Sequence, residues 1–208
     1  SDAIGQLGPV VAALARADMV VDCTVEGLLH APELPTIMQG VDGHMPRLLT
    51  HLLHTPLATR RAFPPPVQEA IRAAIHDGEQ RHRGEIRFVV EGDWPLADLL
   101  SGKSVRERAL EVFGLARAWD TDDNTGILVY VLLCEHKVEI LADRGINRAL
   151  GPQVWYELCD AMTRAFAAGR FEQGSIDLIR QMHVLLATHF PSDGRNPNEL
   201  PDLPIILR

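Results

Sequence analysis

The sequence predicts an α/β fold, a three-layer α/β/α sandwich in which helices cover both faces of a mixed sheet. Strand-like segments rich in β-branched residues alternate with segments of helical periodicity, in the order α-β-α-β-β-α-α. The segment "GILVYVLLC" (126–134) is apolar at every position, which is typical of a central strand buried on both faces. We expect one domain over 60–191, preceded by a helical arm (1–59) and followed by a Pro-rich extended tail (192–208).

The first helix of this domain begins at the prolines 64–66, because proline suits the first turn of a helix. Its apolar stripe has i, i+3, i+4, i+7 and i+8 spacing and consists of Val67, Ala70, Ile71, Ala74 and Ile75. The alternating segment "EIRFVVEG" then predicts a strand. Ser104 with Glu107 three positions later is a capping box, which opens the next helix.

The central strand and the segment 137–142 are predicted to form an antiparallel hairpin that turns at Glu135–His136. The turn lacks an Asn-Gly or Asp-Gly pair, so its type is not specified. A turn at this position places Asp143 across from about Leu128. Two helices, the first beginning at Pro152 and the second ending before Pro191, complete the domain.

The composition excludes some classes of function. The chain has 208 residues and a net charge of −8, which argues against a nucleic-acid surface because phosphate binding needs clustered Lys and Arg. No apolar stretch reaches the length of a transmembrane helix, and no secretory signal is visible. We therefore expect a cytoplasmic or membrane-associated protein.

The loop "DTDDNTG" (120–126) concentrates acidic residues directly before the central strand. Asp122, Asp123 and Asn124 precede that strand, and Asp143 follows its hairpin partner, so both groups should lie at one end of the sheet. If the strand that begins at Glu85 is parallel to the central strand through a right-handed crossover, Glu85 begins at the same end. Such a set of oxygen ligands suits Ca²⁺ or Mg²⁺.

The loop matches the EF-hand pattern only in part. Asp120, Asp122 and Asn124 fit its first three ligand positions, but Thr125 and Val131 stand where glycine and an acid are required. The loop is therefore not an EF-hand. Asp and Asn are also ordinary turn formers, so a solvated turn is the competing interpretation.

Catalytic signatures are absent from the sequence. It has no GxSxG, P-loop, HExxH or GxGxxG motif. Arg144 could contact a phosphate group near a metal ion, or it could neutralise the acidic loop. The loop also lies at the amino ends of the predicted parallel strands, whereas open α/β sheets usually bind ligands at the carboxyl ends.

Three stretches, "DDNTGILVYVLL", "KVEILADRGIN" and "AFAAGRFEQGSIDLI", resemble the TPM-domain family, which is named for thylakoid-lumen, photosystem II repair and acetylcholine-receptor-modulator proteins. "RRAFPPP" and "HRGEIRF" further resemble a bacterial subgroup of that family. The resemblance implies an α/β/α sandwich, calcium binding through acidic loop residues and, for some members, acid phosphatase activity. The implied cation site falls on Asp122, Asp123, Asn124 and Asp143. Many members also carry a signal peptide and a membrane anchor, which this sequence does not show.

The leading hypothesis is a non-catalytic domain that binds Ca²⁺ or Mg²⁺ and helps to assemble a complex with an unknown protein partner. Association with a membrane, through that partner or through a missing anchor, is compatible with the resemblance. The predicted metal ligands are Asp120, Asp122, Asp123, Asn124 and Asp143. One alternative is a metal-assisted acid phosphatase in which Arg144 contacts the phosphate. Another is an adaptor whose acidic loop binds a basic partner without metal.

Overall fold

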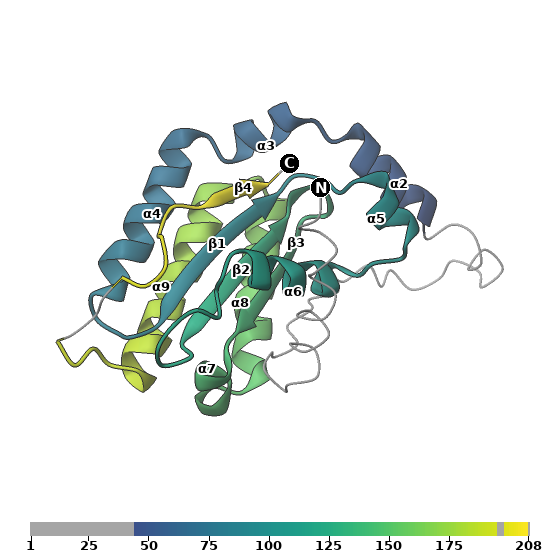
Figure 1. Cartoon of the computed structure of the whole chain (residues 1–208). Helices are drawn as coiled ribbons and strands as arrows, with labels where there is room; N and C mark the ends of the chain where they lie inside the picture. The colour runs from purple at the N-terminus through teal and green to yellow at the C-terminus, as the bar shows by residue number, and fades with distance from the viewer. Residues whose placement is uncertain (1–43, 195–197, 208) are drawn as a thin grey trace.

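The structure, a computed structural model, describes residues 44–194 and 198–207 (Figure 1). Its centre is a four-stranded sheet of strand order β3-β2-β1-β4. The strands are β1 Glu85–Glu91, β2 Gly126–Leu132, β3 Lys137–Ala142 and β4 Ile205–Leu207. β1 is parallel to β2 and to β4, whereas β2 and β3 are antiparallel. The predicted mixed sheet is therefore confirmed, and so is the parallel pairing that places Glu85 beside the start of β2.

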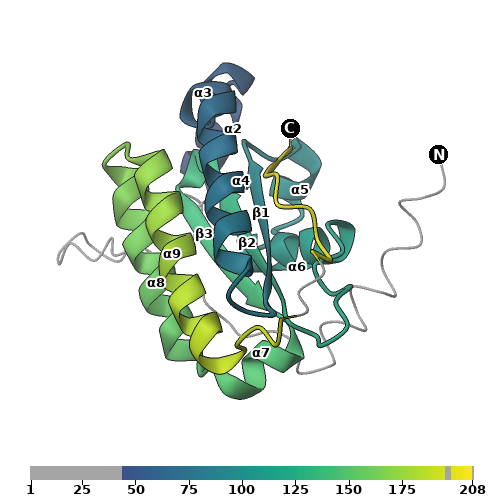
Figure 2. The same ribbon diagram turned by 90° about the vertical axis from the view of Figure 1, so that its left-hand side faces the viewer.

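Helices form a layer on each face of the sheet (Figure 2). One face carries α4 Pro65–Glu79, α8 Pro152–Ala167 and α9 Phe171–His189, and the other carries α5 Leu96–Leu100 and α6 Val105–Leu115. The predicted capping box opens α6, with the Glu107 amide 3.1 Å from Ser104 Oγ and the Ser104 amide 2.7 Å from Glu107 Oε2. The α/β/α sandwich is confirmed.

The side chains of β2 divide the core into two parts. Ile127, Val129 and Val131 belong to the cluster under α4, α8 and α9, while Leu128, Tyr130 and Leu132 belong to the cluster under α6. This alternation follows from the two-residue period of a strand. It explains why the sequence of β2 is apolar throughout.

The hairpin register differs from the prediction. The turn predicted at Glu135–His136 begins earlier, with a 3₁₀ turn, η1 Leu133–Glu135, and His136 after it adopts a left-handed φ of 52°. β2 is shorter as a result, and the Asp143 amide donates to the Gly126 carbonyl at 2.9 Å. Asp143 thus lies across from Gly126 rather than Leu128, because the longer turn moves every pair by two positions. The shift brings Asp143 closer to the acidic loop.

The arm and the tail both pack on the domain. The described part of the arm forms α2 His44–Leu53 and α3 Pro56–Ala62, and residues 1–43 of the predicted arm lie outside the described residues. The tail ends in β4, which pairs with β1 and was not predicted, because three residues in a Pro-rich segment carry little periodicity. None of the helices in the described part of the chain has both the length and the apolarity needed to cross a bilayer.

Candidate functional site

The acidic loop and the turn after β3 meet at the amino end of the sheet, in a region that we call the acidic corner: Asp120, Asp122, Asp123, Asn124 and Asp143. The connection is made by backbone groups. The Gly145 amide, at the start of α7 Arg144–Ala149, donates to the Asn124 carbonyl at 3.0 Å. Asn124 adopts a left-handed φ of 56°, which Asn tolerates better than most residues. The two segments are therefore held in a fixed relation, as the hairpin argument required.

Glycine makes this close approach feasible. A Cβ atom on Gly145 would lie 2.5 Å from the Asn124 carbonyl oxygen and 2.7 Å from that of Asp123. A Cβ atom on Gly126, the first residue of β2, would lie 1.7 Å from the Ala118 carbonyl oxygen. Any larger residue would push the loop away from the sheet.

Most polar side chains of the corner already have protein partners. Arg83 contacts Asp123 at 2.6 Å, Arg117 contacts Asp120, and Arg144 Nε donates to Asn124 Oδ1 at 2.8 Å. These contacts are at the surface, where ion pairs contribute little stability and exchange readily with solvent. Arg144, at the start of α7, therefore lies at the margin of the acidic corner.

Asp143 differs from the other acids of the corner because its side chain is buried. It is the N-cap of α7, and its Oδ1 accepts from the Arg144 amide at 2.6 Å. Burial raises the pKa of Asp143, although hydrogen bonding from the Arg144 amide partly opposes this. The geometry gives Asp143 a structural role in fixing the start of α7.

Asp122 has a different neighbour, which the sequence did not indicate. Its exposed backbone amide donates to the carboxylate of Glu199 at 3.2 Å, and Glu199 belongs to the segment between α9 and β4. Across residues 44–194 and 198–207, neither the Asp122 nor the Glu199 carboxylate makes an ion pair or accepts from a basic side chain. The Glu199 carboxylate thus lies against the backbone of the acidic loop at this edge.

Buried acids lie below this edge, and their ionisation is disfavoured. Glu85, 1% exposed, accepts from the Leu200 amide at 3.1 Å. Burial raises the pKa of Glu85 to about 7, with further contributions from the charges of Glu199 and Asp202. The pKa of Glu79 rises to about 9 because of burial and the neighbouring charge of Glu85. Additional negative charge is therefore unfavourable here, and positive charge is favoured.

The ligand chemistry of the edge suits a hard cation, although the described residues do not form a closed site. No group of three or more His, Cys, Asp or Glu in the described part of the chain is placed to hold a metal ion. Mg²⁺ characteristically binds one or two carboxylates and keeps several waters, and Ca²⁺ also accepts waters among its oxygen ligands. Asp122 and Glu199 could supply two carboxylates to such a hydrated ion.

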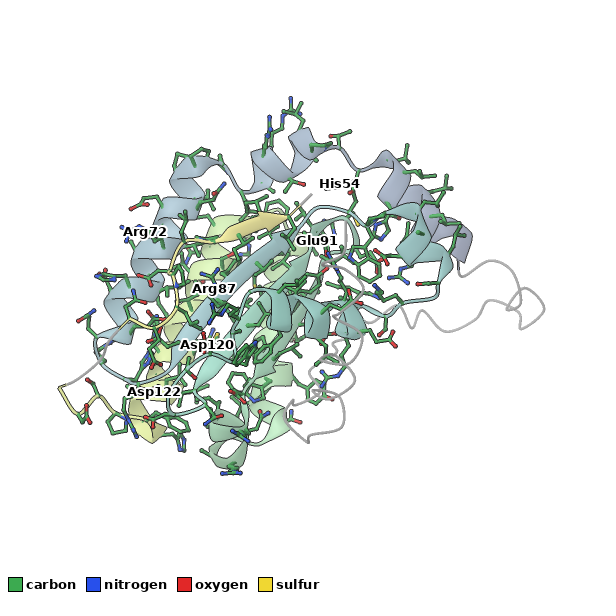
Figure 3. All side chains as sticks on the ribbon, viewed as in Figure 1. His54, Arg72, Arg87, Glu91, Asp120 and Asp122 are labelled. Carbon is green, nitrogen blue, oxygen red and sulfur yellow. The ribbon has the colours of Figure 1, made fainter. Side chains whose placement is uncertain are left out.

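A second candidate region lies at the opposite end of β1. A cavity of about 300 Å³ is lined by residues of the α2–α3 connection, of the end of β1 and of β4, including His54, Thr59, Arg60 and Asp93. His54 Nε2 lies 2.8 Å from Thr59 Oγ1, and burial lowers the pKa of His54. Figure 3 shows His54 at one end of β1 and Asp122 at the other. The sequence did not predict this cavity, because it depends on where the arm and β4 pack.

The fold and the order of its segments agree with comparisons to known proteins. A family model described as the TPM domain matches residues 60–184, more than half of the chain. The chain belongs to the TPM-domain family. Within the TPM domain lie all five residues of the acidic corner, whereas α2, β4 and Glu199 are outside the match.

This TPM domain is also similar to a solved structure, described as the NMR structure of BA42 protein from the psychrophilic bacteria Bizionia argentinensis. The two share 30% sequence identity with a TM-score of 0.60, over 67% of this chain and 92% of that chain. No curated protein matches the chain.

Proposed function

We propose that this TPM domain binds a hydrated divalent cation, Ca²⁺ or Mg²⁺, at the edge formed by Asp122 and Glu199, and that it serves as a non-catalytic interaction module. The observation that carries the proposal is the hydrogen bond from the Asp122 amide to the Glu199 carboxylate, which brings a distant acid to the acidic corner. Neighbouring carboxylates repel each other unless a positive charge lies between them. A cation at this edge would remove that repulsion.

The remaining residues of the corner support this role in two ways. Asn124 and Asp143 fix the loop against α7, so that Asp122 is presented on an ordered backbone. Asp123 and Asp120 lie next to Asp122 in the loop, and their exposed pairs with Arg83 and Arg117 can open at little cost. Either carboxylate could therefore turn towards a bound ion as a further ligand.

The accessibility of the edge supports an interaction role. Asp122 and Asp123 are exposed, so a cation bound there keeps coordination positions that face solvent. A carboxylate of a protein partner can occupy those positions and complete the oxygen shell. In the described part of the chain no hydrogen bond joins a histidine to the acidic corner, so a general base of that type does not contact it.

Calorimetric titration of the full chain with Ca²⁺ and with Mg²⁺ tests the proposal. We expect one site in the wild type, weakened at least tenfold in the double variant Asp122→Asn/Glu199→Gln, because two charged ligands are lost. Glu172→Gln is the matched control, since it removes an exposed acid at the start of α9 and should leave the affinity unchanged. At a cation concentration ten times Kd, binding should stabilise the wild type by about 1.4 kcal/mol in thermal unfolding.

The alternatives give different results. Absence of both heat and stabilisation in the wild type would support the metal-free adaptor that binds a basic partner. Steady hydrolysis of a phosphate ester by the wild type, lost in both Asp123→Asn and Arg144→Ala, would replace the non-catalytic role with the metal-assisted phosphatase.

A further inference from the structure

The exposed apolar side chains of the protein gather at one end. Among the described residues, ten large hydrophobic side chains are exposed, and six of them lie in α2, α3 and α5. The six are Leu49, Leu52, Leu53, Leu57, Leu96 and Leu100, with exposures from 50% to 77%. Single exposed leucines are common, but a gathering of this kind marks an interaction surface.

α2 presents its apolar side outward. Leu49, Leu52 and Leu53 have i, i+3 and i+4 spacing, so they share one side of the helix. α2 contacts the domain through Leu48, which packs on the cluster under α6, and through Arg47 and His51, which both reach Glu135, at 2.6 Å and 2.7 Å. A helix that packs only on its own core would have the reverse arrangement. The leucines of α2 are therefore available to something outside the described residues.

The charge of this end differs from that of the rest of the chain. Residues 44–68 contain no Asp or Glu, although the whole chain has a net charge of −8. On α3, Arg60 and Arg61 are exposed and follow Leu57 by three and four positions, which places all three on one side of the helix. In α5, the charge of Asp98 is balanced by Lys103 at 2.9 Å. Leucines and free arginines thus occur together.

We propose that this leucine–arginine surface, formed by the six leucines with Arg60 and Arg61, docks on an anionic lipid bilayer. Leucines on short helices enter the boundary between headgroups and acyl chains, and arginines bind the phosphate groups of the headgroups. The inference goes beyond the proposed cation binding and does not depend on it.

Two features favour a lipid surface over a protein partner. The surface is spread over α2, α3 and α5 at the outer end of the molecule, where a deformable bilayer can follow it (Figure 1). In addition, the acidic corner lies at the opposite end of β1, so its negative charge faces away from the bilayer (Figure 3).

Co-sedimentation of the full chain with vesicles tests the proposal. We expect binding to vesicles of phosphatidylglycerol and phosphatidylcholine that is at least tenfold stronger than binding to phosphatidylcholine alone, because two arginines contribute. Leu52→Ser/Leu53→Ser should lower binding to the anionic vesicles at least tenfold, through lost burial of apolar area. Arg60→Gln/Arg61→Gln should remove the preference for anionic lipid and the sensitivity to salt.

Val184→Ser is the matched control, because Val184 is 66% exposed on α9 and away from the surface. It should bind the vesicles as the wild type does. All of these positions are exposed, and circular dichroism confirms that each variant is folded. The proposal is overturned if the wild type does not bind anionic vesicles, or if the leucine variant binds them as well as Val184→Ser does. Self-association of the wild type that the leucine variant abolishes, without vesicle binding, would assign the surface to a protein partner instead.

Discussion

The two ends of the central sheet hold their acidic residues in different ways. At the carboxyl end, buried Glu91 contacts Arg108 at 2.6 Å and 2.9 Å and also accepts from Trp94 and Tyr130. At the amino end, the Glu199 carboxylate accepts from the Asp122 amide, and neither acid has a basic partner among the described residues. Glu91 is thus used internally to stabilise the fold, whereas Asp122 and Glu199 remain available to bind something else.

The pKa values of the acids show the same difference. At the carboxyl end, burial alone would raise the pKa of Glu135, but hydrogen bonds from His51 and Arg47 hold it below its usual value. At the amino end, burial and neighbouring acids raise the pKa of Glu85 to about 7. An ionised carboxyl is therefore favoured at one end and disfavoured at the other, which is where a bound cation would have the greater effect.

Gly126→Ala should disrupt the packing of the acidic loop on the start of β2 and give the largest loss of stability. The new Cβ would lie 1.7 Å from the Ala118 carbonyl oxygen, so the loop before β2 must move or the strand must shift. We expect a loss of on the order of 3 kcal/mol or more in the free energy of unfolding, measured by urea denaturation. Gly151→Ala, where a Cβ meets nothing within 4 Å, should change it by less than about 1 kcal/mol. Equal losses would show that the loop contact is not required.

Removing one arginine from each end should lower the free energy of unfolding by different amounts. Arg108→Met leaves Glu91, which is 1% exposed, without its charged partner and should cost about 2 kcal/mol in urea denaturation. Arg83→Met breaks the surface pair with Asp123 and should cost under about 1 kcal/mol. A larger loss for Arg83→Met would contradict the assignment of a structural role to the carboxyl end.

The free energy of unfolding should also depend on pH through a buried acid at the amino end. Because folding raises the pKa of Glu79 from 4.5 to about 9, the folded state binds this proton more tightly. The resulting stability is present below pH 4.5 and is lost as pH rises towards 9. Glu79→Gln keeps a carbonyl oxygen for the Ile86 amide but cannot ionise. The variant and the wild type should be similar at pH 5, and the variant should become progressively more stable than the wild type as pH rises towards 9. A difference that does not change with pH would exclude this ionisation.

The fold could be predicted from the sequence where one local signal determined one element. The β-branched, apolar residues of β1 and β2 indicated two buried strands, and the Ser104–Glu107 capping box marked the start of α6. A right-handed crossover through the capped helix between β1 and β2 then predicted parallel strands, which bring the acidic loop and Glu85 to one end. Local patterns and the rules of connection were sufficient for these features.

Other features depended on contacts that no local pattern records. The hairpin register moved because a 3₁₀ turn followed by a left-handed residue replaced the expected short turn, and the turn sequence carries no glycine or Asn-Gly pair that would indicate this. β4 has only three residues, and its partner β1 lies far away in the sequence. The contact between Asp122 and Glu199 spans 77 positions, so no local pattern indicated Glu199 as a candidate ligand.

The late position of β4 has a consequence for how the protein folds. The Leu200 amide reaches Glu85 across 115 positions, and β4 pairs with β1 just beyond that contact. Pairings between positions so far apart in the sequence form late, so tail docking should follow formation of the β1–β2–β3 core. Before the tail docks, one edge of β1 has unpaired backbone amide and carbonyl groups that can pair with another chain. During synthesis, β1 is made well before β4, so a ribosome-bound intermediate would be exposed to misassembly.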